Sequence, residues 1–133
     1  MSLNMKKCKH LNIGNLEQNT NYYFPQNEPI EKVNKEKDLG VVFDNKLKFS
    51  QHVSQAVNKG NRILGLIFRT FVFMDIAMFL TLYKSLIRPN LEYATQVWSP
   101  FLKKDQIAIE NVQRRATKRV HSIENLPYHA RLK

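Results

Sequence analysis

The chain has 133 residues, 43% of them hydrophobic, with only four Gly and five Pro, which excludes a fibrous or disordered chain and is typical of one ordinary globular domain. Its single cysteine, Cys8, excludes an internal disulfide, and Lys6, Lys7 and Lys9 leave no room for a secretory signal, so we expect an intracellular protein of the nucleus or cytoplasm. The net charge of +10 is uneven: residues 1–44 carry six Lys against six Asp and Glu, whereas residues 45–133 carry fifteen Lys and Arg against five acids, which favours a polyanionic partner, although a basic surface also serves solubility alone.

The sequence pattern predicts β-strands in residues 1–44. Short β-branched and aromatic runs at 9–14, 21–24, 30–33 and 37–44 are separated by polar stretches that resemble loops. We therefore expect a small antiparallel β unit over residues 1–44.

The hydrophobic period changes to that of a helix after Phe49. Ser50 is a plausible N-cap. Lys59, Arg62 and Arg69 fall opposite the apolar stripe, which consists of Val53, Ala56, Val57, Gly60, Leu64, Ile67, Phe68 and Phe71. The apolar run at 63–83 is interrupted by Arg69 and Asp75. Its uncharged stretches are therefore shorter than the ~20 residues needed to span a bilayer, and we expect no membrane partner.

A second helix is expected to begin at an Asp75 cap and to end at Pro89, which lacks a backbone donor. Its predicted buried residues are Ile76, Phe79, Leu80, Tyr83 and Ile87. Asn90 is expected to cap a third helix, which ends before the Ser-Pro pair at 99–100. This helix is expected to place Tyr93 and Trp98 in the core. Arg88 and Glu92 are spaced for an ion pair, i to i+4.

A fourth helix is predicted over residues 103–121, with Ile109, Val112, Ala116 and Val120 on its inner stripe and Arg114, Arg115 and Lys118 opposite. Pro127 is suited to the first turn of a further helix, which the chain does not finish, so we expect a fragment. The predicted fold is α+β, with a β region at 1–44, a helical domain at 45–126 and the start of a truncated helix at 127–133.

No catalytic or metal site is evident in the sequence. The four histidines have no cysteine or carboxylate at metal-ligand spacing, and no Gly-rich phosphate loop is present. Asp38, Asp44, Asp75 and Asp105 all stand singly, whereas two-metal phosphoryl transfer requires paired carboxylates. We expect no independent active site.

Four segments in order resemble the C-terminal part of the reverse transcriptase of non-LTR retrotransposons of the LINE or jockey-like kind. They are "LNMKKCKHLNIG" (3–14), "KDLGVVFDNKLKFSQHV" (37–53), "LYKSLIRPNLEYATQVWSPFLKKD" (82–105) and "IENVQRRATKRV" (109–120), followed by "LPYHARLK". The resemblance covers nearly the whole chain and rests above all on "RPNLEYATQVWSP" followed by "VQRRATKR".

The resemblance implies an RNA-directed DNA polymerase with the shape of a right hand. In it Lys7 matches a palm lysine that donates a proton to pyrophosphate, Leu39 and Gly40 match the primer-grip hairpin, and the helices match the thumb. The catalytic aspartates and the Mg²⁺ that they bind in the intact enzyme belong to a part of the palm that this sequence does not contain. We therefore expect no polymerisation by this chain, no catalytic residue and no cofactor or metal of its own.

The thumb of that family grips a template-primer duplex, so the resemblance implies contacts with nucleic-acid phosphates by exposed cations. The candidates are Arg62, Arg69, Arg114, Arg115, Lys118 and Arg119. Solvated faces of amphipathic helices are the competing interpretation, and an internal ion pair is an alternative for Arg119. A host-adopted nucleic-acid-binding protein without catalysis and a helical protein-interaction module remain alternative functions, and the oligomeric state stays open.

Overall fold

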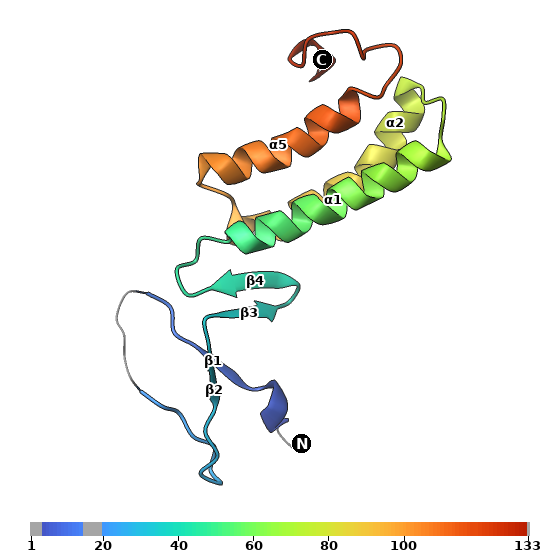
Figure 1. The fold of residues 1–133 in the computed structure, drawn as a ribbon. Helices are drawn as coiled ribbons and strands as arrows, with labels where there is room; N and C mark the ends of the chain where they lie inside the picture. Colours follow the sequence, from blue (N-terminus) through green and yellow to red (C-terminus); the bar gives the residue numbers. More distant parts are fainter. Residues whose placement is uncertain (1–3, 15–19, 133) are drawn as a thin grey trace. The chain divides into compact units, whose positions relative to one another are not determined.

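Figure 1 shows the computed structural model, which describes residues 4–14 and 20–132. The chain forms two compact units, Met1–Phe49 and Ser50–Lys133. Among the described residues, the strands lie in the first unit and the α-helices in the second, which confirms the predicted α+β class. The unit boundary falls a few residues after the predicted one at 44, and residues 127–132 belong to the second unit.

The first unit contains two small sheets. A 3₁₀ helix at Met5–Lys7 precedes β1 (Lys9–Leu11), which pairs with β2 (Glu31–Val33), and β3 (Lys35–Asp38) pairs with β4 (Val41–Asp44). The β3–β4 pair is antiparallel, as expected, but β1 and β2 are parallel, with Lys9 opposite Glu31. The long connection over residues 12–30 allows the chain to return in the same direction. The run predicted as a strand at 21–24 forms only an isolated bridge between Tyr23 and Pro29.

The β3–β4 hairpin turns at Leu39 and Gly40, whose φ angles are 44° and 85°. Positive φ at both central residues is the requirement of a type I′ turn, whose twist matches that of the flanking strands. Beyond the turn, Val41 and Val42 are buried, and the ring of Phe43 meets the buried Phe49 edge-on at 5.6 Å between centroids. The Phe43–Phe49 contact thus joins β4 to the residue that precedes α1 (Ser50–Thr70).

The second unit is helical. Its elements in chain order are α1 (Ser50–Thr70), α2 (Ile76–Leu82), a π-helical turn η2 (Tyr83–Ile87), α3 (Arg88–Glu92), α4 (Thr95–Trp98), α5 (Lys103–Thr117) and a 3₁₀ helix η3 (Ala130–Leu132). As predicted, Asp75 caps α2 by accepting a hydrogen bond from the Met78 N–H at 2.7 Å.

Helices α1 and α5 lie side by side and run in the same direction (Figure 1). Three contacts in matching order fix this direction: the Ser50 hydroxyl donates to Asp105 at 2.6 Å, Gly60 faces Val112, and Asn61 accepts from Arg115. The missing side chain of Gly60 lets α3 and α5 approach α1 closely, because a Cβ there would lie 3.1 Å from Leu91 and 3.4 Å from Val112. The predicted stripe of α1 is confirmed, with Val53, Ala56, Leu64 and Ile67 in the core.

Two local predictions between α2 and α4, the helix end at Pro89 and the Asn90 cap, are wrong. Pro89 does not end the helix: the preceding turn widens to η2, in which the Arg88 N–H donates to the Tyr83 carbonyl, and Pro89 lies in the first turn of α3. A widened turn accommodates a proline because it removes the clash with the carbonyl four residues earlier. Asn90 is therefore not a cap but lies inside α3, where its amide donates to the Leu86 carbonyl at 2.6 Å. The break comes at Ala94, which has a φ of 54°.

The burial of several residues also differs from the prediction. Trp98 is fully buried, but Tyr93 is 54% exposed and is not a core residue, and Ile76 and Leu80 are also exposed. Ser50 is the first residue of α1, and its hydroxyl is turned to Asp105 instead of capping its own helix. Helix α5 ends at Thr117, short of the predicted residue 121, so Arg119 follows the helix.

Candidate nucleic-acid interface

The exposed cations of α1 and of the end of α5 include four arginines that we call the basic seam (Arg62, Arg69, Arg115 and Arg119), of which the two from the end of α5 contact α1. The Arg115 guanidinium donates to the side-chain oxygen of Asn61 at 3.1 Å, and the Arg119 guanidinium lies 5.3 Å from the centre of the Phe68 ring. Asn61 and Phe68 directly precede Arg62 and Arg69 in α1. The seam thus combines two arginines of α1 with two from the end of α5.

The spacing within the seam follows from helix geometry. Residues 61 and 68 are seven apart, so the contact of Arg115 with Asn61 and the contact of Arg119 with Phe68 lie about 10 Å apart along α1 and on nearly the same side of it. Neighbours in sequence are rotated by about 100°, which turns Arg62 and Arg69 away from the side that meets α5 and onto the exposed side of α1, opposite its apolar stripe. A length of about 10 Å corresponds to roughly three phosphates along one strand.

The local contacts orient the seam without neutralising it. Arg115 is held by a neutral amide, Arg119 by an aromatic face and Arg69 by the Gly65 carbonyl, to which its Nε donates at 3.2 Å. Such contacts restrict a guanidinium but leave its charge and several N–H donors available. Arg119, for which an internal ion pair was the alternative, contacts the Phe68 ring.

Arg114 and Lys118 are placed differently from the four seam residues. The Arg114 guanidinium stacks on Tyr128 at 4.6 Å from the ring centre, on the side of the C-terminal segment. Burial, followed by the negative charge of Glu110, raises the pKa of Tyr128 despite the opposing effect of Arg114. Lys118 is the exposed C-cap residue of α5. The structure therefore holds Arg115 and Arg119 against α1 and places Arg114 against the C-terminal segment.

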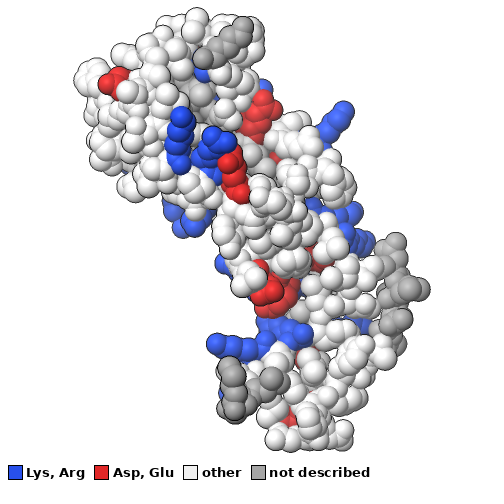
Figure 2. Space-filling view, turned by 180° about the vertical axis from the view of Figure 1, so that it is seen from behind, with Lys and Arg blue, Asp and Glu red and all other residues white. Residues whose placement is uncertain are grey.

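The distribution of charge agrees with a local site and not with a uniformly basic surface. Residues 50–70, which form α1, include Lys59, Arg62 and Arg69 and no acidic residue. On the face drawn in Figure 2, the Lys and Arg side chains stand in separate groups, some of them directly beside acidic side chains. Positive charge on this face is therefore divided among several groups and is not spread evenly over it.

The residues matched to the palm and the primer grip lie in the first unit. Lys7 is exposed at the end of the 3₁₀ helix, and its backbone N–H donates to the Asn4 carbonyl at 3.0 Å. Leu39 is 83% exposed at the tip of the β3–β4 hairpin and adopts a left-handed conformation that is costly for a residue with a branched side chain. The turn geometry gives a reason for Gly40, but it gives none for Leu39.

Two exposed apolar residues near the seam escaped the sequence analysis. Val72 and Phe73, between α1 and α2, are 85% and 78% exposed, and the Phe73 ring lies 6.3 Å from that of His121. In the sequence these two residues directly follow Phe71, the last residue of the predicted apolar stripe. The hydrophobic pattern alone therefore did not separate them from that stripe. The signal that distinguishes them is the helix end at Thr70.

The acidic side chains of the described residues stand apart from one another. Within residues 4–14 and 20–132, no three His, Cys, Asp or Glu side chains come together as metal ligands would. Asp44, Asp75 and Asp105 each accept hydrogen bonds from their own surroundings instead. No helix in the described part of the chain has the length and apolarity needed to cross a membrane.

Comparison with known proteins identifies no family. Neither a family model nor a solved structure matches the chain. Over 102 residues the chain is 28% identical to an uncharacterized protein of Caenorhabditis elegans, and the match covers 74% of this chain and 52% of that protein. The chain thus spans about half the length of the curated relative it matches, whose name assigns no activity.

Proposed function

We propose that residues 50–133 grip the sugar-phosphate backbone of a nucleic-acid duplex, as the thumb-like part of a reverse transcriptase of the non-LTR, LINE or jockey-like kind. The basic seam carries this proposal, because Arg115 and Arg119 are held against α1 by contacts about 10 Å apart, and Arg62 and Arg69 are exposed on the same helix. The ordered sequence resemblance supports the same conclusion independently.

The electrostatics of the second unit favour a polyanion. Residues 50–133 contain thirteen Lys and Arg and five Asp and Glu. Two of these acids serve the fold, Asp75 as a helix cap and Asp105 as the acceptor of the Ser50 hydroxyl. Guanidinium groups that are already oriented lose little freedom when they bind phosphate, and phosphate contacts of this kind carry no base specificity.

Catalysis is not part of this proposal. Phosphoryl transfer by the two-metal mechanism requires carboxylates that hold both ions. The aspartates of this chain stand singly, and the described ones named above are committed to hydrogen bonds within the fold. The chain binds a duplex and, taken alone, synthesises no DNA.

The test is fluorescence anisotropy of a labelled RNA/DNA hybrid titrated with the full chain over a series of salt concentrations. Four contacted phosphates give a slope of log affinity against log salt of roughly −4, because each phosphate adds about 0.9. A variant with Arg62, Arg69, Arg115 and Arg119 all changed to Gln is expected to lose most of this slope, and a change of base sequence is expected to leave it unaltered.

The control variant removes the same charge elsewhere, by changing Lys6, Lys32, Lys103 and Lys104 to Gln, which are all exposed. Equal loss of slope in both variants would show that only total charge matters and would overturn the seam as a site. Binding of acidic peptides that survives salt sufficient to release the hybrid would favour a protein-interaction module instead.

A further inference from the structure

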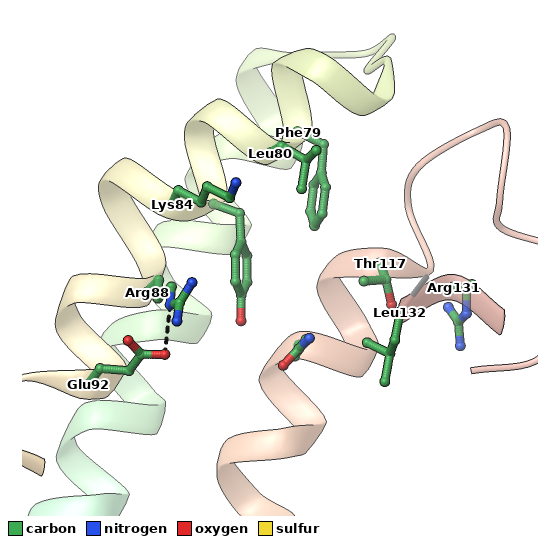
Figure 3. Close-up of a pocket in the computed structure, with 10 residues that line it drawn as sticks. Phe79, Leu80, Lys84, Arg88, Glu92, Thr117, Arg131 and Leu132 are labelled. Carbon is green, nitrogen blue, oxygen red and sulfur yellow. Dashed lines mark hydrogen bonds and ion pairs between the residues drawn. The ribbon is translucent and has the colours of Figure 1, made fainter. Parts of the chain in front are cut away.

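A second basic feature of the helical unit is a pocket of about 420 Å³. Figure 3 shows its two walls: Lys84, Arg88 and Glu92 project from η2 and α3 on one side, and Thr117 and Leu132 lie on the other. Phe79 and Leu80 of α2 close one end with apolar surface. This volume lies in the range of pockets that hold small organic ligands.

The lining carries an excess of positive charge. Three cations contribute to it, Lys84, Arg88 and Arg131, against a single carboxylate, Glu92. Glu92 accepts from the Arg88 Nε at 2.8 Å and so offsets one of the three charges. The walls therefore present two uncompensated positive charges.

Arg131 is the least satisfied of these cations. Its Nε and Nη1 atoms are buried and meet no hydrogen-bond acceptor within residues 4–14 and 20–132. Its guanidinium lies 5.6 Å from the centre of the Tyr128 ring, a contact that offers no acceptor in the ring plane. Because these two atoms are closed to solvent, they do not face the open pocket, but the Arg131 side chain lines it and adds a positive charge that no acid of the lining pairs.

Neutral donors surround the same space. Gln113 of α5 and Tyr83 of η2 line the pocket. Burial is the main reason that the pKa of Tyr83 is raised, with the negative charge of Glu92 acting in the same direction. The Tyr83 hydroxyl therefore stays protonated near neutral pH and can donate a hydrogen bond.

We propose that this pocket binds a phosphomonoester attached to a flat apolar group, the chemistry shared by a nucleoside monophosphate and the phosphorylated end of a nucleic-acid strand. A phosphomonoester carries a charge of about −1.5 to −2 at pH 7 and three terminal oxygens, which suits two positive charges that approach from different elements. A planar carboxylate carries half this charge. The aromatic and aliphatic surface of Phe79 and Leu80 suits the ring.

The inference does not rest on duplex binding by the basic seam, and the test keeps them apart. Calorimetric titrations of the full chain in about 0.15 M salt compare adenosine monophosphate with adenosine, and phenyl phosphate with benzoate. We expect each phosphate compound to bind at least about tenfold more tightly than its partner, because the phosphate forms charge-assisted hydrogen bonds that adenosine cannot form, and carries more negative charge and one more terminal oxygen than benzoate. A 5′-phosphorylated dinucleotide that binds more tightly than the mononucleotide identifies the strand end as the source, and equal or weaker binding identifies the free nucleotide.

The variants locate the binding. Lys84→Gln and Arg131→Gln are each expected to weaken adenosine monophosphate about tenfold, whereas Lys103→Gln, at an exposed position outside the pocket, is expected to leave it unchanged. Lys84 is also exposed, so its variant decides the matter even if Arg131→Gln fails to fold. Equal binding of adenosine and its monophosphate, equal binding of benzoate and phenyl phosphate, or an unchanged affinity in Lys84→Gln would overturn the proposal. Affinity for a hybrid without terminal phosphates reports on the seam alone.

Discussion

Asp44 shows how one side chain organises the end of the β hairpin. Its carboxylate accepts three backbone hydrogen bonds, from Lys46 at 3.0 Å, Lys48 at 3.2 Å and Phe49 at 2.8 Å. The same stretch contains Leu47 and Phe49 with φ angles of 50° and 56°. Left-handed conformations are unfavourable for such residues, so the hydrogen bonds to Asp44 compensate for local strain.

These contacts also make the hairpin end sensitive to pH. Burial alone raises the pKa of Asp44, but the hydrogen bonds from Lys48, Phe49 and Lys46, together with the Lys48 charge, outweigh it and hold the pKa below its ordinary value. The unfolded chain then binds the proton more readily than the folded chain. The resulting stability is present above the unfolded pKa of about 4 and is lost as pH falls through the folded pKa.

We predict that Asp44→Ala lowers the unfolding free energy of the first unit by about 1–2 kcal/mol at pH 7, as the loss of a comparable cap does. The variant should also lose the part of the fall in stability below about pH 4 that we expect Asp44 to contribute in the native chain. The backbone amide resonances of residues 46–49, followed by NMR over a pH titration, report both effects. Asp38→Asn in the same hairpin is the control, and an equal effect there would contradict a special role for Asp44.

At the scale of the element, the two glycines in α1 differ in the space around them. A Cβ on Gly65 would meet nothing within 4 Å, whereas one on Gly60 would lie 3.1 Å from Leu91 and 3.4 Å from Val112. Glycine in a helix interior costs about 1 kcal/mol relative to alanine. Only at Gly60 does close packing of α3 and α5 account for this cost.

We predict that Gly65→Ala raises the unfolding free energy by about 1 kcal/mol, while Gly60→Val lowers it by about 1–3 kcal/mol through overpacking. Urea denaturation followed by fluorescence measures both, because Trp98 is the only tryptophan and is buried in the same unit. A stabilised Gly60→Val variant would mean that the contacts among these three helices adjust freely.

At the scale of the whole molecule, the two units differ in the size of their cores. The main cluster of buried apolar residues lies in the second unit and includes Leu64, Ile67, Val112 and Ala116. Among the described residues of the first unit, only Val41, Val42 and Phe49 are buried. Since burial of apolar surface is the main source of stability, the first unit is expected to open at a lower free energy.

Hydrogen exchange tests this expectation directly. Amides in the middle of α1 and α5 are predicted to exchange at least about tenfold more slowly than those of β1 and β2, because exchange in each unit follows its own opening equilibrium. Equal protection of both units would show that they unfold together, and would remove the reason to treat the second unit as the part that binds by itself.

The sequence alone determined what depends on neighbours along the chain. Hydrophobic period predicted α1 and the inner stripe of α5, a short polar side chain predicted the Asp75 cap, and helical spacing predicted the Arg88–Glu92 pair, which forms at 2.8 Å. These features arise within a few residues, so their signals are present in any short window. The α+β class followed from the same local signals.

Only the tertiary structure decided what depends on residues far apart in sequence. Three contacts join distant segments: the parallel pairing of β1 with β2, the hydrogen bond between Ser50 and Asp105, and the hydrogen bond between Arg115 and Asn61. The helix also continues through Pro89, where the proline by itself predicts a helix end. It continues because the turn η2 is widened and because Ile87 and Leu91 are buried. Local propensity is worth tenths of a kcal/mol to a few kcal/mol per residue, and burial in a shared core can outweigh it, so the positions of the charged groups followed from packing.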